Sequence, residues 1–148
     1  MSEGDDPIYG LIVEIRGAFN ELKAFADDAN ADLGVTAAMR AVLEHLAWHG
    51  PSTVPDIART KSVSRQHIQK LADALVAASL ARFEPNPAHK RSALLAPTGA
   101  GERTFATIRQ REAGALARLG EGLDPTRCRE AAETVAALRR ALAALGQG

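Results

Sequence analysis

The side chains with the most specific chemistry in this chain of 148 residues follow directly after Ser64. Arginine can donate two hydrogen bonds to a guanine edge, and glutamine can pair in a similar way with adenine. Both residue types occur in one short run: Arg65, Gln66, His67, Gln69 and Lys70. Ser64 and the backbone amides of a helix that begins there can hold a phosphate. The run therefore predicts a contact with double-stranded DNA.

A second basic group stands at the end of a loop that is rich in turn-forming residues, residues 85–91. Its basic or titratable side chains are His89, Lys90 and Arg91, and short candidate strands lie on both sides, at 81–84 and 92–95. A hairpin with such a tip can reach a flanking minor groove, where narrow A·T-rich stretches attract arginine and lysine. We expect this hairpin to be a second contact with DNA.

The charge distribution supports a DNA partner although the formal net charge is zero. Residues 57–91 contain seven Lys or Arg side chains and two acidic ones, so this stretch carries +5 and the rest of the chain carries −5. Phosphate binding depends on clustered Lys and Arg rather than on the total. The asymmetry places any DNA contact in the middle of the chain.

The elements that must position these groups are expected to be mainly helical, since aromatic residues make up only 4% of the chain while Ala, Leu and Arg are plentiful. Thr36, Thr53 and Ser64 are good N-caps for three helices with apolar spacings of three and four residues. With the hairpin they predict a winged helix-turn-helix lobe with a two-stranded β-wing over residues 36–95. We expect one domain over residues 1–148, with a frayed start from Met1 to Asp6 and helices over 7–33 and 97–146 that flank the lobe.

Both flanking regions carry apolar seams that we expect to mediate dimerisation. The seam residues are Ile8, Ile12, Ile15, Phe19, Val135, Leu138, Leu142 and Leu145. Each seam has few partners within a chain of this length, and palindromic DNA sites require a two-fold dimer. We therefore expect a homodimer, with packing inside one subunit as the alternative.

His45 and His49 are four residues apart with Trp48 between them. Two histidines at this spacing can bind a metal, but no set of thiols and carboxylates accompanies them, so a packed or solvated pair is the preferred interpretation. Cys128 is the sole cysteine, which excludes an internal disulfide. We expect it to be a small buried apolar residue. A redox sensor beside Arg127 and Arg129 is the alternative.

Several function classes lack support in the sequence. We find no Gly-rich phosphate loop, no nucleophile elbow and no convincing carboxylate pair, so we predict neither an enzyme nor a bound cofactor or metal. No stretch approaches the ~18 uninterrupted apolar residues that span a bilayer, and the N-terminus lacks a basic region followed by an apolar run. We expect a cytoplasmic protein without a membrane partner.

The central part of the chain resembles the MarR (multiple antibiotic resistance regulator) family. The resemblance is carried by Thr53–Ala58, Ser64–Leu75, Leu80–Phe83, Asn86–Ser92 and Thr98–Gly101. The order of six helices and a wing is similar over nearly the whole chain, with motif-level specificity in the central third. The family's wing usually reads Asp-Pro-x-Asp-Arg-Arg-Ala followed by Leu-Thr-x-x-Gly. Here Asn86 and His89 replace the two acids, and Pro97 replaces the leucine. Asn86 cannot form the ion pair with arginine that steadies the family's wing.

The resemblance implies a transcription regulator that binds a pseudo-palindromic operator as a homodimer, with the first, fifth and sixth helices of the two subunits interlocked. It also implies a repressor that a small ligand or an oxidant relieves. We expect an aromatic or phenolic effector, in a pocket that His45, Trp48 and His49 help to line.

Two other function classes stay open. In one, the winged helix is a protein-interaction module whose basic face meets an acidic partner, and neutral total charge and the altered wing favour it. In the other, the chain is a ligand-carrying dimer without a regulatory role. Selection of DNA from random oligonucleotides separates the first from a sequence-specific regulator, and the second would show tight small-molecule binding but no effect of that ligand on DNA.

Overall fold

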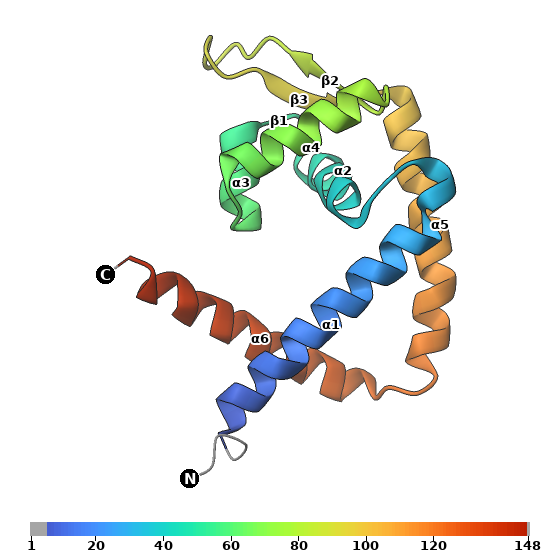
Figure 1. Cartoon of the computed structure of the whole chain (residues 1–148), viewed down its shortest axis with the longest axis vertical. Helices are drawn as coiled ribbons and strands as arrows, with labels where there is room; N and C mark the ends of the chain where they lie inside the picture. The colour runs from blue at the N-terminus through green and yellow to red at the C-terminus, as the bar shows by residue number, and fades with distance from the viewer. Residues whose placement is uncertain (1–5, 148) are drawn as a thin grey trace. The chain divides into compact units, whose positions relative to one another are not determined.

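The computed structural model describes residues 6–147, and the expected frayed start, except for Asp6, lies outside them. The helices are α1 (Pro7–Ala29), the short 3₁₀ helix η2 (Ala31–Leu33), α2 (Ala37–His49), α3 (Val54–Lys61), α4 (Arg65–Ala77), α5 (Gly99–Gly120) and α6 (Pro125–Leu145). The strands are β1 (Ser52–Thr53), β2 (Ala81–Glu84) and β3 (Leu94–Pro97). The fold is mainly helical with a winged helix-turn-helix, as the sequence predicts (Figure 1).

The predicted N-caps are confirmed. The side-chain oxygens of Thr36, Thr53 and Ser64 accept hydrogen bonds from the backbone N–H groups three residues later, at 3.2, 3.2 and 3.0 Å. These bonds satisfy N–H groups that have no partner inside the helix, which fixes where α2, α3 and α4 begin. Gly50 ends α2 with a φ of 76°, a conformation that favours glycine.

The wing differs from the expected two-stranded hairpin because β1 joins it, giving a three-stranded antiparallel sheet in the order β1-β3-β2. Ser52 pairs with Leu95, and Phe83 on β2 pairs with the same residue from the other side. The third strand also begins two residues later than the expected 92–95. The backbone N–H of Ser92 donates to the carbonyl of His89 at 3.3 Å, so this part of the backbone belongs to the wing turn.

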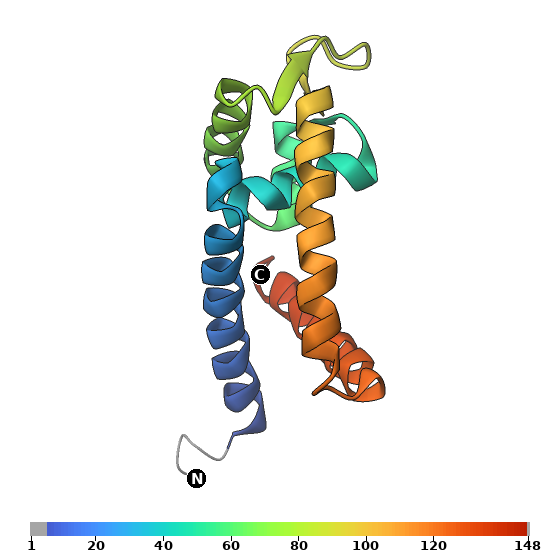
Figure 2. The ribbon, with the colours of Figure 1, turned by 90° about the vertical axis from the view of Figure 1, so that its right-hand side faces the viewer.

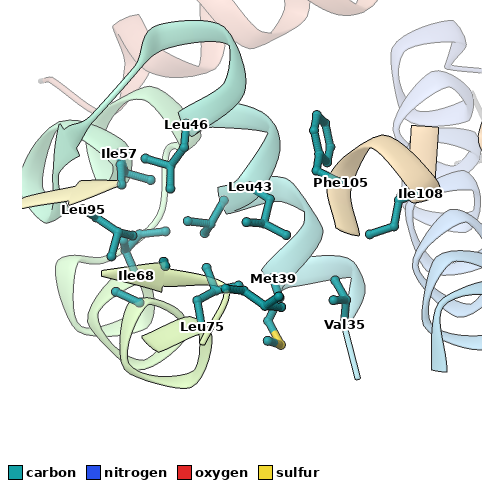
Figure 3. Close-up of a cluster of buried hydrophobic side chains, with 14 of the residues drawn as sticks. Val35, Met39, Leu43, Leu46, Ile57, Ile68, Leu75, Leu95, Phe105 and Ile108 are labelled. Carbon is teal, nitrogen blue, oxygen red and sulfur yellow. The ribbon is translucent and has the colours of Figure 1, made fainter. Parts of the chain in front are cut away.

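One hydrophobic core holds α2, α3, α4, the sheet and the first turns of α5 together (Figure 3). Its largest fully buried side chains include Leu43 and Leu46 from α2, Ile57 from α3, and Leu75 from α4. Gly101 allows α5 to approach β2 closely, because a Cβ atom there would lie 1.9 Å from the carbonyl oxygen of Leu80. The core therefore fixes α4 and the wing strands relative to each other.

The chain divides into two compact units, Met1–Ile108 and Arg109–Gly148. Within the first unit, α1 joins the lobe at its C-terminal end, where the Asp27 carboxylate accepts a hydrogen bond from the Ala37 backbone N–H at 2.6 Å (Figure 1). That bond holds the pKa of Asp27 below its ordinary value. Neither α1 nor α6 has a fully buried residue. The single domain expected from the sequence stays a prediction, as do its internal boundaries.

Candidate nucleic-acid interface

The N-terminal half of α4 presents one polar face to solvent. Ile68, Ala72 and Leu75 are buried in the core on one side of this helix. Because these residues recur every three to four positions, the opposite face is directed outward. All the side chains predicted for the recognition helix are exposed: Ser64, Arg65, Gln66, His67, Gln69 and Lys70. The structure therefore leaves this polar edge accessible, and its contact with DNA stays a prediction.

A groove of about 540 Å³ lies between α4, the start of α3 and the wing. We call it the wing groove, and its lining residues are Val54, Pro55, Arg65, Gln66, Gln69, Phe83, Arg91, Ser92 and Ala93. Arg65 and Arg91 are separated by 25 positions in the sequence, and the fold brings them to the same groove. No carboxylate belongs to the lining, so its charge is positive.

The wing turn is held by hydrogen bonds rather than by an ion pair. The Oδ1 atom of Asn86 accepts from the Ala88 backbone N–H at 3.1 Å, and its carbonyl accepts from the His89 N–H at 3.2 Å. An asparagine in this role mimics a backbone turn. Asn86 thus orders the turn although it cannot replace the ion pair of the family's wing. His89, Lys90 and Arg91 are exposed in the loop, which extends beyond the strands (Figure 2).

Ion pairs remove part of the basic charge from this surface. Arg59 pairs with Asp56 at 2.5 Å, and Arg82 pairs with Glu84 at 2.7 Å. Across residues 6–147, the structure gives no ion-pair partner to the following basic side chains: Lys61, Arg65, Lys70, Lys90 and Arg91. The unpaired basic charge of this surface is therefore carried by α4, the wing and the end of α3.

Sequence inspection missed several residues of the wing groove. Val54, Pro55 and Phe83 form its apolar part, and Phe83 is 40% exposed. It also missed the hydrogen bond from the Gln69 side-chain amide to the Asp73 carboxylate, at 2.9 Å. The spacing of four residues on a helix was a signal for this bond, because such pairs face each other. The apolar part had no comparable signal, since it depends on how the wing packs.

His45, Trp48 and His49, predicted to help line an effector pocket, lie in different environments. His45 is buried, with its Nε2 atom 3.2 Å from the Ser52 hydroxyl oxygen, and burial is the main cause that lowers its pKa. Its ring centroid lies 4.5 Å from that of His49, which is exposed. Trp48 is 66% exposed. Residues 6–147 contain no group of three or more His, Cys, Asp or Glu side chains that could hold a metal ion.

A pocket of about 260 Å³ lies next to this part of α2. Its lining residues are Leu43, Leu46, Ala47, Gly50, Pro51, Arg82, Glu84, Ala96, Pro97, Gly101, Glu102 and Phe105. The pocket lies between the end of α2, the wing strands and the start of α5. None of the three predicted residues belongs to its lining, so their role in ligand binding stays a prediction.

The seam residues expected at a dimer interface are exposed or partly exposed in the single chain. Ile8, Phe19, Leu142 and Leu145 are exposed, and Ile12, Ile15, Val135 and Leu138 are partly buried. Cys128, expected to be buried, is exposed, because α6 buries none of its residues fully within this chain. Among residues 6–147, no helix is both long enough and apolar enough to cross a membrane.

Comparisons with known proteins agree with this architecture. The sequence profile of the MarR family matches residues 33–92. Uncharacterized proteins of Mycobacterium tuberculosis and Mycobacterium bovis are 37% identical over 93 residues, and the match spans 63% of this chain and 63% of each relative.

Solved structures extend the likeness over nearly the whole chain. A crystal structure of a MarR family transcription regulator is 27% identical with a TM-score of 0.82, and the match covers 99% of this chain and 97% of the other. A Staphylococcus aureus MarR in complex with salicylate and kanamycin has a TM-score of 0.77 at 13% identity, over 90% of each chain. At this identity, the second structure shows the fold alone.

Proposed function

Because the chain belongs to the MarR family of transcription regulators, which are DNA-binding proteins rather than enzymes, we propose that it binds a specific DNA sequence as a homodimer. The observation that carries the proposal is the wing groove, where Arg65, Gln66 and Gln69 of α4 face the same space as Arg91 of the wing. Arginine and glutamine at the exposed start of a recognition helix are the side chains that read base edges in the major groove.

In the proposed complex, α4 enters the major groove and the wing contacts the next minor groove. Arg65, Gln66 and Gln69 contact base edges, and His67 and Lys70 lie beside them. Ser64 and the first amides of α4 hold a phosphate. His89, Lys90 and Arg91 contact the flanking groove, and the DNA backbone between the two grooves passes through the wing groove.

The proposed homodimer is supported by the apolar surface that the single chain leaves exposed. Ile8 is 60% exposed and Phe19 is 66% exposed on α1, and Leu145 on α6 is 78% exposed. Soluble monomers rarely expose such surfaces, and burying them against a second copy is favourable by about 25 cal/mol per Å². We propose a single domain in which residues 7–33 and 97–146 form the dimer and present two lobes, residues 36–95, to DNA half-sites ~34–36 Å apart.

A small aromatic or phenolic effector is proposed to relieve repression. Its proposed site is the pocket of about 260 Å³, where Leu43, Leu46 and Phe105 offer an apolar surface to a ring. Arg82 also lines this pocket but is paired with Glu84, so an acidic group of the effector would have to compete with that carboxylate. The pocket also includes Ala96 and Pro97 of β3, so an occupant would contact the base of the wing. The S. aureus relative bound to salicylate is a precedent in the same fold. We place the regulator in the cytoplasm, where its DNA target would be.

Selection of DNA from random duplexes by the full-length chain tests the proposal. We expect enrichment of a pseudo-palindrome with half-sites about one helical turn apart and a Kd in the nanomolar range at stated salt. Arg65→Ala should relax the base preference at one position of each half-site, at a cost of about 1–3 kcal/mol for the preferred base. Equal binding to random and selected DNA would contradict the proposal. A stoichiometric protein partner with no enriched DNA would favour the protein-interaction module instead.

A further inference from the structure

Of the two glutamines on the exposed N-terminal half of α4, Gln66 and Gln69, only Gln69 has a hydrogen-bond partner for its side-chain amide in the described structure. Its Nε2 atom donates to the Oδ1 atom of Asp73 at 2.9 Å, and both side chains are exposed on α4. Gln66 lines the same groove, but within residues 6–147 the structure gives its side chain no partner. The two glutamines therefore differ in orientational freedom although they face the same space.

Asp73 determines which end of the Gln69 carboxamide faces outward. An ionised carboxylate only accepts hydrogen bonds, so the amide nitrogen must be the atom that faces it. The carboxamide is planar, with its oxygen and nitrogen on opposite arms, so the oxygen points away from Asp73. One N–H is occupied, and one acceptor and one N–H remain for a base.

This arrangement has a consequence for which base Gln69 can contact. Adenine presents the N7 acceptor and the N6 amino donor in the major groove, and an amide oxygen beside an N–H complements this pair. Guanine presents two acceptors, N7 and O6. A freely rotating carboxamide can turn its two N–H groups toward those acceptors, whereas one held by Asp73 presents an oxygen that guanine repels.

We propose that Asp73 is a positioning residue that holds the Gln69 carboxamide with its oxygen outward and thereby makes Gln69 select adenine over guanine. The proposal rests on the function proposed above. Asp73 acts through Gln69 and contacts no base itself. In the proposed complex the negative charge of Asp73 also lies near the DNA. Removing this charge should therefore raise the affinity for all duplexes, and this effect must be separated from the effect on the preference for adenine.

Two substitutions separate these effects. Asp73→Glu keeps the charge and a carboxylate that only accepts hydrogen bonds, so we expect unchanged affinity and unchanged base preference. Asp73→Ala removes the charge and the hydrogen-bond acceptor, so we expect higher affinity for all duplexes together with a loss of preference. Discrimination by one good pair is typically about 1–3 kcal/mol, so adenine over guanine should fall from roughly 5- to 150-fold to within about twofold.

The experiment compares DNA selected by the full-length wild type and by the Gln66→Ala, Gln69→Ala, Asp73→Glu and Asp73→Ala variants, with thermal melting as a check of folding. Gln69→Ala should identify the position read by Gln69, and Asp73→Ala should lose preference at that position only. Unchanged preference in Asp73→Ala, or a loss in Asp73→Glu equal to that in Asp73→Ala, would overturn the positioning role. If Gln69→Ala changes no position while wild type still enriches a pseudo-palindrome, the inference fails and the proposed function stands. If wild type enriches no sequence, the proposed function fails as well.

Discussion

Replacing Arg91 by alanine should weaken DNA binding and make the binding affinity less dependent on the salt concentration. Arg91 is exposed on the wing, lines the wing groove, and has no ion-pair partner within the part of the chain that the structure describes. Its charge is therefore available to a phosphate. A homodimer loses two such charges, and each neutralised phosphate contributes about −0.9 to the slope of log K against log salt, so the slope should become less steep by about 1.8.

The effect on affinity follows from that slope. Between about 50 and 200 mM salt the wild type should lose roughly ten times more affinity than Arg91→Ala does, because the salt concentration changes fourfold. Fluorescence anisotropy titrations of a selected duplex at several salt concentrations measure both slopes. Arg91→Lys keeps the charge and should keep the slope. Arg139→Ala removes an exposed arginine of α6, a helix assigned above to the dimer interface, and should leave the slope unchanged.

Two results would refute this reasoning. An unchanged slope in Arg91→Ala would mean that the wing arginine contacts no phosphate. A changed base preference with an unchanged slope would assign Arg91 to direct reading of bases instead.

Three further outcomes are expected. Ser64→Ala removes the oxygen that accepts from the His67 N–H at 3.0 Å and should lower the free energy of unfolding by about 1 kcal/mol in urea titrations, and no measurable loss would contradict the capping role. Phe19→Glu places a charge on an exposed apolar face of α1 and should shift the dimer toward monomer in sedimentation experiments, whereas Glu21→Gln on the same helix should not. Burial holds the pKa of His45 below the ordinary value of 6.5, so the unfolded chain takes up the proton first and stability should be lost as the pH falls through that value toward the lower folded-state pKa. Thermal melts across this range should show a flatter dependence for His45→Gln, and identical curves would contradict the assignment.

Local features of the fold could be predicted because their causes lie within a few residues. Thr36, Thr53 and Ser64 each bond a backbone N–H only three positions away, so residue type and apolar spacing were sufficient. The exposed polar edge of α4 could be predicted equally well, because Ile68, Ala72 and Leu75 identify the buried face of the helix.

Features that depend on distant pairing could not be predicted. Strand β1 has two residues and forms only because Ser52 and Thr53 pair with Leu95 and Leu94. Such a short segment has no alternation of apolar and polar residues that could predict a strand. The later start of β3 has a similar cause, since the bond from Ser92 to His89 extends the wing turn. The wing groove depends on the core that fixes the wing beside α4, and no local pattern encodes the distance between Arg65 and Arg91.

The most direct test of α4 as the element that enters DNA is site-specific photo-crosslinking to a selected duplex. Gln66→Cys and Arg139→Cys, each in a Cys128→Ser background, allow a cross-linker to be attached on α4 or on α6. We expect the label at position 66 to react with bases of the half-site and the label at position 139 to give no adduct. Adducts from position 139 with none from position 66, in proteins that still bind the duplex, would show that a different surface contacts DNA.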